Sequence, residues 1–106
     1  MNLSNLITSQ SYINDEIVAA KRAAGDYSIL VSPEFDYEGE TYRVLLDGHH
    51  SLAAALEDGA EIDVTEATAT MSDSVALIEK GQIEDFLSAT YMDSDYRFAL
   101  SGKDVW

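Results

Sequence analysis

The chain has 106 residues, of which 20 are acidic and 6 are basic, and its formal net charge is −14. Such a surface repels phosphate backbones and anionic lipids, so direct binding to nucleic acid or to a membrane surface is disfavoured. The hydrophobic share of 46% suffices for one core, and the absence of cysteine excludes disulfides, a thiolate nucleophile and cysteine zinc sites. Because the sequence has neither a basic leader nor an apolar run of about 20 residues, we expect a cytoplasmic protein.

The N-terminal part, residues 1–25, has the apolar spacing of helices. Apolar residues between Leu3 and Ala24 follow one helical face if a break is allowed near residues 9–11, which predicts two short helical pieces. The second piece begins near Asn14, a common N-cap residue, and ends at Gly25. Acidic residues in its first turn and basic residues in its last turn suit the helix dipole.

Residues 27–68 carry the pattern of a small α/β core. A β-branched run at 28–32 and a second run at 41–46 predict two strands, which we expect to pair as a hairpin. Leucine and alanine at 51–57 predict a short helix that ends at a glycine. Alternating polar and apolar residues at 61–68 predict a half-buried strand whose acidic side chains face water.

The C-terminal part, residues 71–106, is predicted to be helical and then extended. Gly81 divides 71–89 into two helical segments, and the tail from residue 91 is expected to pack back onto the domain. The chain is therefore predicted to be a single α/β domain of the α+β type, residues 1–106, with a mixed sheet and flanking helices. The residues expected in its core are Leu45, Leu52, Leu56, Val64, Ile78 and Phe86.

The segment 42–55 is the one that suggests chemistry, because a strand, a glycine turn and a helix start follow one another there. A helix N-terminus presents unpaired N–H groups and a partial positive charge, and a phosphate is its natural ligand. The candidate phosphate-binding residues are Gly48, His49, His50 and Ser51, and the candidate catalytic residues are Asp47, His49 and His50. The alternative interpretation is that both histidines are neutral hydrogen-bonding groups that support the helix start.

The order of strand, Asp47-Gly48-His49-His50 and alanine-rich helix between Tyr42 and Ala55 resembles the ParB-like nuclease and sulfiredoxin superfamily. The resemblance implies a small α/β domain that holds a nucleotide phosphate at the helix start; the cofactor is unknown from the sequence, and a nucleotide with Mg²⁺ is the candidate if the protein is an enzyme. It also implies relatives among partition proteins, nucleases, a serine kinase and sulfiredoxins. Ser51 stands where the family has arginine, which removes a forked, permanently charged phosphate donor. Without cysteine, sulfiredoxin chemistry is excluded.

The acidic surface supports a different hypothesis, a non-enzymatic interaction protein. Its carboxylates would imitate the phosphates of DNA and inhibit a basic, nucleic-acid-handling partner, as small acidic inhibitors encoded by phages or mobile elements do. The candidate partner-binding residues are Glu34, Asp36, Glu38, Glu40, Glu57, Asp58, Glu61 and Asp63, with further acidic groups at Asp15, Glu16, Glu66, Glu84, Asp85, Asp93 and Asp95. The charge could equally reflect solubility or a saline habitat.

The second hypothesis is a nucleotide-dependent enzyme, a nuclease or a small-molecule phosphotransferase, that uses the helix start after Gly48. We favour the interaction protein, because the missing arginine and the net charge both disfavour an anionic substrate. No metal site is predicted. The two adjacent histidines lack the spacing of helical zinc sites, and 93–95 lacks the later ligands of a calcium loop.

Overall fold

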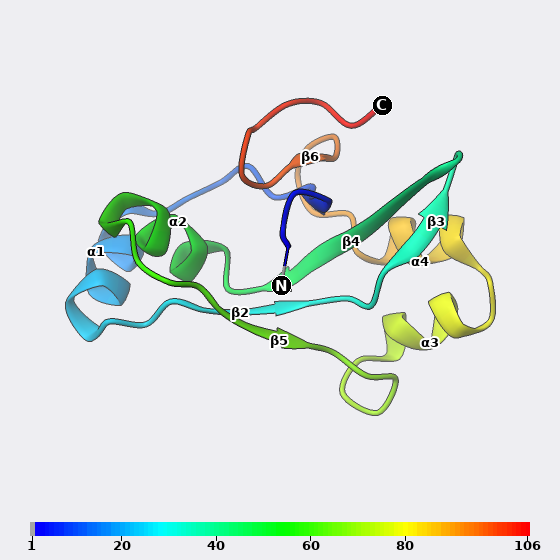
Figure 1. The fold of residues 1–106 in the computed structure, drawn as a ribbon, viewed down its shortest axis with the longest axis horizontal. Coiled ribbons are helices and arrows are strands. Elements are labelled where there is room, and N and C mark those ends of the chain that lie inside the picture. The colour runs from blue at the N-terminus through cyan, green and yellow to red at the C-terminus, as the bar shows by residue number, and fades with distance from the viewer. Residues whose placement is uncertain (1) are drawn as a thin grey trace.

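Strand β4 (Glu40–Asp47) lies at the centre of the sheet in the computed structural model, which describes residues 2–106. The strand order is β5-β2-β4-β1-β6, and β3 also pairs with β4 (Figure 1). The other strands are β1 (Leu6–Thr8), β2 (Ser28–Val31), β3 (Phe35–Tyr37), β5 (Asp63–Glu66) and β6 (Arg97–Phe98). The β1–β4 and β2–β5 pairs are parallel and the remaining pairs antiparallel, so the predicted mixed sheet is confirmed.

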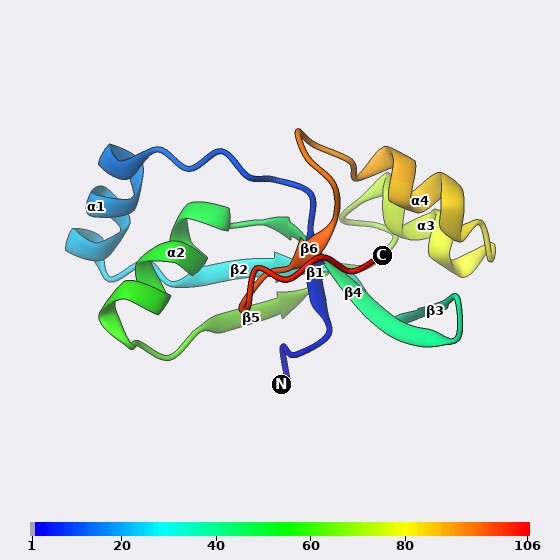
Figure 2. The same ribbon diagram turned by 90° about the horizontal axis from the view of Figure 1, so that it is seen from above.

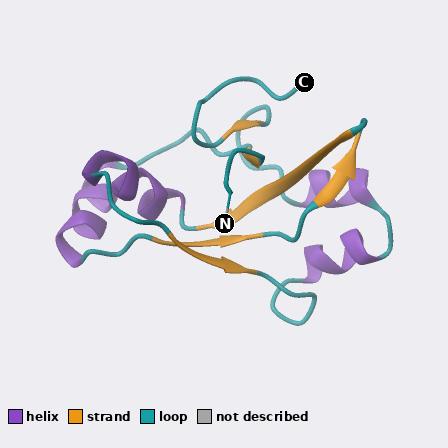
Figure 3. Cartoon of the chain, in the orientation of Figure 1, coloured by secondary structure: helices purple, strands orange, loops and turns teal. Residues whose placement is uncertain are grey.

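The described residues form four helices, which lie in two groups at opposite ends of the molecule (Figures 2 and 3). Helices α1 (Asp15–Ala24) and α2 (His49–Asp58) form one group. Helices α3 (Asp73–Glu79) and α4 (Ile83–Ala89) lie at the other end, near the β3–β4 hairpin. None of the helices in residues 2–106 has the length and hydropathy needed to cross a bilayer. The predicted α+β class with flanking helices is confirmed.

Local end signals place the helices where the sequence predicted them. The Asn14 side chain accepts hydrogen bonds from the N–H groups of Glu16 and Ile17, and Gly25 ends α1 in the left-handed conformation. Helix α2 begins at His49, two residues earlier than predicted. Gly81 separates α3 from α4 as expected, and the tail returns to the sheet as β6.

The first predicted helical piece is wrong, because its residues form β1. Leu6 is paired with Arg43 of β4 and Thr8 with Arg97 of β6, so long-range hydrogen bonding decides the conformation. Leu6 and Ile7 belong to different hydrophobic clusters, as adjacent residues of a strand must. Long-range pairing of this kind routinely overrides a local pattern of only a few residues.

The strands predicted at 28–32 and 41–46 do pair, but the expected hairpin between them is wrong, because a further strand, β3, lies between them in the chain. β3 pairs with the first half of β4 and β2 with its second half, where Val31 is opposite Leu45. Ser32 maintains the pairing across the interruption, since its N–H donates to the Val44 carbonyl and its hydroxyl accepts from the Val44 N–H. The turn at 38–40 therefore joins β3 to β4.

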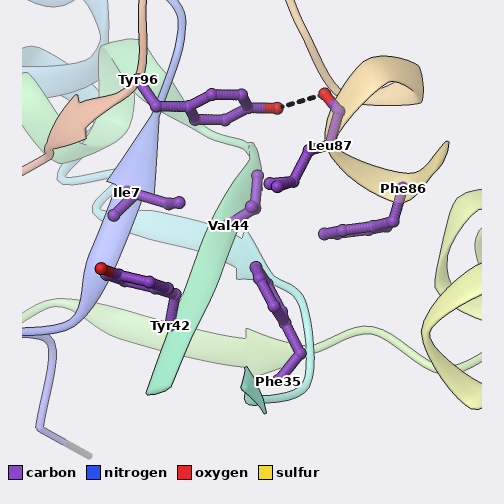
Figure 4. Close-up of a cluster of buried hydrophobic side chains, with 7 residues drawn as sticks. All are labelled: Ile7, Phe35, Tyr42, Val44, Phe86, Leu87 and Tyr96. Atoms are coloured by element: carbon purple, nitrogen blue, oxygen red, sulfur yellow. Dashed lines mark hydrogen bonds between the residues drawn. The ribbon is translucent and has the colours of Figure 1, made fainter. Parts of the chain in front are cut away.

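The sheet separates two hydrophobic clusters. One comprises Ile7, Phe35, Tyr42, Val44, Phe86, Leu87 and Tyr96 (Figure 4), and the other comprises Leu3, Leu6, Ile29, Val31, Leu45 and Leu52. Of the predicted core, Leu45, Leu52 and Phe86 are buried, and Val64 and Ile78 are half-buried against these clusters. Leu56 is a wrong prediction, because α2 buries Ser51, Leu52, Ala54 and Ala55 and leaves Leu56 50% exposed at its edge.

The two leucines of α2 provide a matched test of this packing. Leu52→Ala is expected to lower the free energy of unfolding by about 2–5 kcal/mol, because it empties a packed site. Leu56→Ala is expected to cost less than about 1 kcal/mol, since half of its side chain already contacts water. Urea denaturation of both variants measures the difference, and equal losses would contradict the assigned helix face.

Candidate functional site

Gly48 shapes the turn between β4 and α2. Its φ of 93° is left-handed, and a Cβ there would lie 2.6 Å from the Ser28 carbonyl oxygen and 2.8 Å from the Ile29 Cα. Only glycine therefore allows β4 to turn into α2 this close to β2. Gly48 occupies the N-cap position and supplies no side-chain cap, and its N–H donates to the Asp47 carboxylate at 2.8 Å.

Gly59, at the other end of α2, is the natural control for this close approach. Its φ of 60° is also left-handed, but no atom lies within 4 Å of a Cβ placed there. Gly59→Ala is expected to cost about 1–2 kcal/mol from the backbone conformation alone. Gly48→Ala is expected to cost more than about 3 kcal/mol, because the methyl group also overlaps backbone atoms. Urea denaturation compares the two, and a similar cost at both positions would argue against the tight packing of the turn.

The two histidines join the start of α2 to other elements. His49 Nε2 lies 2.7 Å from the Thr8 hydroxyl of β1. Burial lowers the pKa of His49 to about 4, so the imidazole is neutral at pH 7 and offers no positive charge. His50 Nε2 accepts a hydrogen bond from the Asn14 N–H at 3.1 Å, which connects the start of α2 to the start of α1.

The His49 pKa makes the stability of the fold depend on pH. The unfolded imidazole binds a proton near pH 6.5 and the folded one only near pH 4, so acidification favours the unfolded state. Stability is expected to fall by about 2 kcal/mol between about pH 7 and about pH 5, above the range where the carboxylates titrate. His49→Gln should remove most of this slope, as measured by urea denaturation at both pH values. A wild-type protein without the slope would contradict the assignment.

Two cavities of about 350 and about 340 Å³ flank the helix start, and Lys21, Asp47, Gly48 and Ser51 line both. Lys21 is their only cationic lining residue, and its ammonium group lies 2.9 Å from the Asp26 carboxylate. The hydrogen bond from Lys21 lowers the pKa of Asp26, with a further contribution from the Ser51 hydroxyl. The site therefore contains two carboxylates, one paired ammonium group and the neutral imidazole of His49, which together attract an anion weakly.

The structure brings Asp47, Gly48, His49, His50 and Ser51 together at this turn, as their adjacency requires. Ser51 is 2% exposed and lines both cavities with a neutral side chain. Among residues 2–106, no three His, Asp or Glu side chains come together as ligands for a metal ion.

The candidate partner-binding carboxylates lie in two separate places. The group at 34–40 runs from the residue before β3 to the first residue of β4, whereas the group at 57–63 runs from the end of α2 to the start of β5, at the other end of the molecule (Figure 1). Four acidic side chains bind arginines of this chain: Glu34 and Glu66 bind Arg43, and Glu57 and Asp58 bind Arg22. Asp36 accepts from the Thr41 hydroxyl and Asp63 from the Ser28 hydroxyl. Glu38, Glu40 and Glu61 are exposed.

Sequence reasoning missed an aromatic groove of about 500 Å³ at the α4 end. One wall is the face of α4 with Glu84, Leu87 and Ser88, at spacings of three and four residues, and Tyr91 follows just after the helix ends. Tyr37 of β3, Tyr96 and Trp106 complete it, and we call this set the aromatic groove. The spacing along α4 was a usable signal, whereas the convergence with Tyr37 and Trp106 depends on the tertiary fold.

Comparisons of the chain with protein-family models, with curated proteins and with solved structures give no significant match.

Proposed function

We propose that this protein is a non-enzymatic interaction protein that binds a basic, nucleic-acid-handling protein through its acidic surface and competes with that partner's nucleic acid. The observation that carries the proposal is that half of its basic residues are paired with carboxylates of the same chain. Of the six basic residues, Lys21, Arg22 and Arg43 form ion pairs with carboxylates of the same chain. The charges of these side chains are compensated within the chain, and the carboxylates outnumber the remaining basic residues.

The start of α2 supports the same proposal by what it offers a ligand. An anionic substrate needs cationic or donor groups that are not already engaged. Here the ammonium group of Lys21 is paired, and His49 is neutral at pH 7. Serine in place of arginine adds only a neutral hydroxyl. These features favour binding of a cationic partner over phosphate chemistry.

The α4 end of the molecule is the contact face that we propose. Exposed carboxylates of two elements meet there, with Glu38 and Glu40 on the β3–β4 hairpin and Glu84 and Asp85 in the first turn of α4. Burial raises the pKa of Tyr37, and the negative charges of Glu84 and Glu38 raise it further, as both act on this ring. Complementary charge of this kind steers a basic partner and selects against acidic ones.

A double charge reversal tests this face against a matched control. Glu38→Lys with Glu84→Lys is expected to weaken partner binding about tenfold or more, because it reverses the charges nearest the contact. Glu16→Lys with Glu61→Lys makes the same change in net charge at the other end and is expected to change binding by less than about threefold. Both variants should fold, since the four side chains are exposed.

The measurement begins with capture of a partner by the immobilised protein at low salt. The partner is then identified and purified, and its dissociation constants are measured for wild type and both variants. The captured protein is expected to bind duplex DNA or RNA, and that nucleic acid should displace it. A partner that is insensitive to nucleic acid and to both variants would overturn the proposal, and loss of binding in the control variant alone would overturn the assigned face.

A further inference from the structure

The aromatic groove has the composition of a receptor for a cationic side chain. The Trp106 ring centroid lies 5.5 Å from that of Tyr37, 5.4 Å from that of Tyr42 and 5.8 Å from that of Tyr96. The electron-rich faces of tryptophan and tyrosine attract ammonium and guanidinium groups. Its volume of about 500 Å³ is within the range of small ligand sites.

The walls of the groove differ in rigidity and exposure. Tyr96 is 7% exposed, and its hydroxyl donates to the Leu87 carbonyl at 2.7 Å, which fixes its ring against α4 (Figure 4). Tyr91 and Trp106 are 53% and 56% exposed, so their rings remain open to a ligand. Exposed large aromatic side chains gathered at one cavity are a feature of binding surfaces.

The charge at the groove has one sign. Glu84 has the only carboxylate side chain that lines the groove, and no lysine, arginine or histidine lines it. Glu38 and Glu84 both act on the Tyr37 phenol from different elements. A guanidinium or ammonium group in this groove would therefore contact aromatic rings and a carboxylate at once.

We propose that the aromatic groove binds an arginine or lysine side chain of the basic protein partner, with Tyr37, Tyr91 and Trp106 around the cation and Glu84 as its counter-ion. The identity of the partner rests on the proposed function, whereas the preference for a cation rests on the groove itself. Charge complementarity favours a cationic occupant, because Glu84 lines the groove without a basic residue and the whole chain carries a net charge of −14.

Trp106 is the one tryptophan of the chain, so its fluorescence reports on this groove alone. The full chain is titrated with a short blocked arginine peptide and with the matching citrulline peptide, in which a neutral urea group replaces each guanidinium group. The arginine peptide is expected to produce a saturable change in fluorescence. The citrulline peptide should bind at least about tenfold more weakly, because it has the same shape without the charge.

Variants separate the groove from the general acidity of the chain. Tyr91→Ala and Glu84→Gln are each expected to weaken arginine-peptide binding about threefold to tenfold. Tyr12→Ala and Glu16→Gln are the matched controls and should bind like wild type, since Tyr12 is 64% exposed and neither residue lines the groove. Thermal unfolding of the Tyr91→Ala protein should match that of wild type, because its side chain is half exposed.

The possible results each decide the proposal. Equal binding of arginine and citrulline peptides, no saturable fluorescence change, or normal binding by Tyr91→Ala would overturn it. If the groove binds the arginine peptide but no basic partner is captured, the proposed function fails and the groove assignment survives. If a captured partner binds the Tyr91→Ala protein normally, the groove assignment fails and the proposed function survives.

Discussion

Burial of β4 on both faces is the constraint on which the rest of the structure depends. Four consecutive residues, Tyr42 to Leu45, are each no more than 7% exposed. One of them is Arg43, whose charge must be compensated away from water. Glu34 and Glu66 provide this compensation at 3.1 and 3.3 Å, from the segment before β3 and from the end of β5. Satisfying one buried guanidinium group therefore fixes two segments relative to the central strand.

This arrangement also determines where the remaining charge can lie. Ion pairs hold Arg43, Arg22 and Lys21 at the sheet and the α1–α2 end, while the carboxylates without such partners project into water. The molecule is 40 Å long, and charges are screened within about 8 Å at physiological ionic strength. The acidic groups at its two ends consequently repel each other little, and each end presents its own electrostatic surface. An elongated shape allows a net charge of −14 without a large cost to folding.

Local signals in the sequence predicted much of the fold, and tertiary contacts determined the rest. The N-cap at Asn14 and the glycines that end α1 and α2 can be recognised from a few neighbouring residues, and both helices form where these signals place them. β1 could not be predicted from its own three residues, because its partners are at 43–44 and 97–98. The turn at Gly48 was predictable as a site of close backbone approach. The hydrogen bond between Thr8 and His49 was not predictable, because the local pattern around Thr8 is that of a helix and not of a strand.

The two candidate sites differ in what they leave for a ligand. At the start of α2, Asp47 binds the Gly48 N–H, His49 contacts Thr8, and His50 accepts from Asn14. The polar groups of this segment, which resembles a catalytic motif, are therefore already engaged in hydrogen bonds that join β1, α1 and α2. The aromatic groove has no motif in the sequence, yet its rings are exposed and its carboxylate faces them. Because binding energy comes from groups that the fold has not already used, the groove is the stronger candidate for recognition.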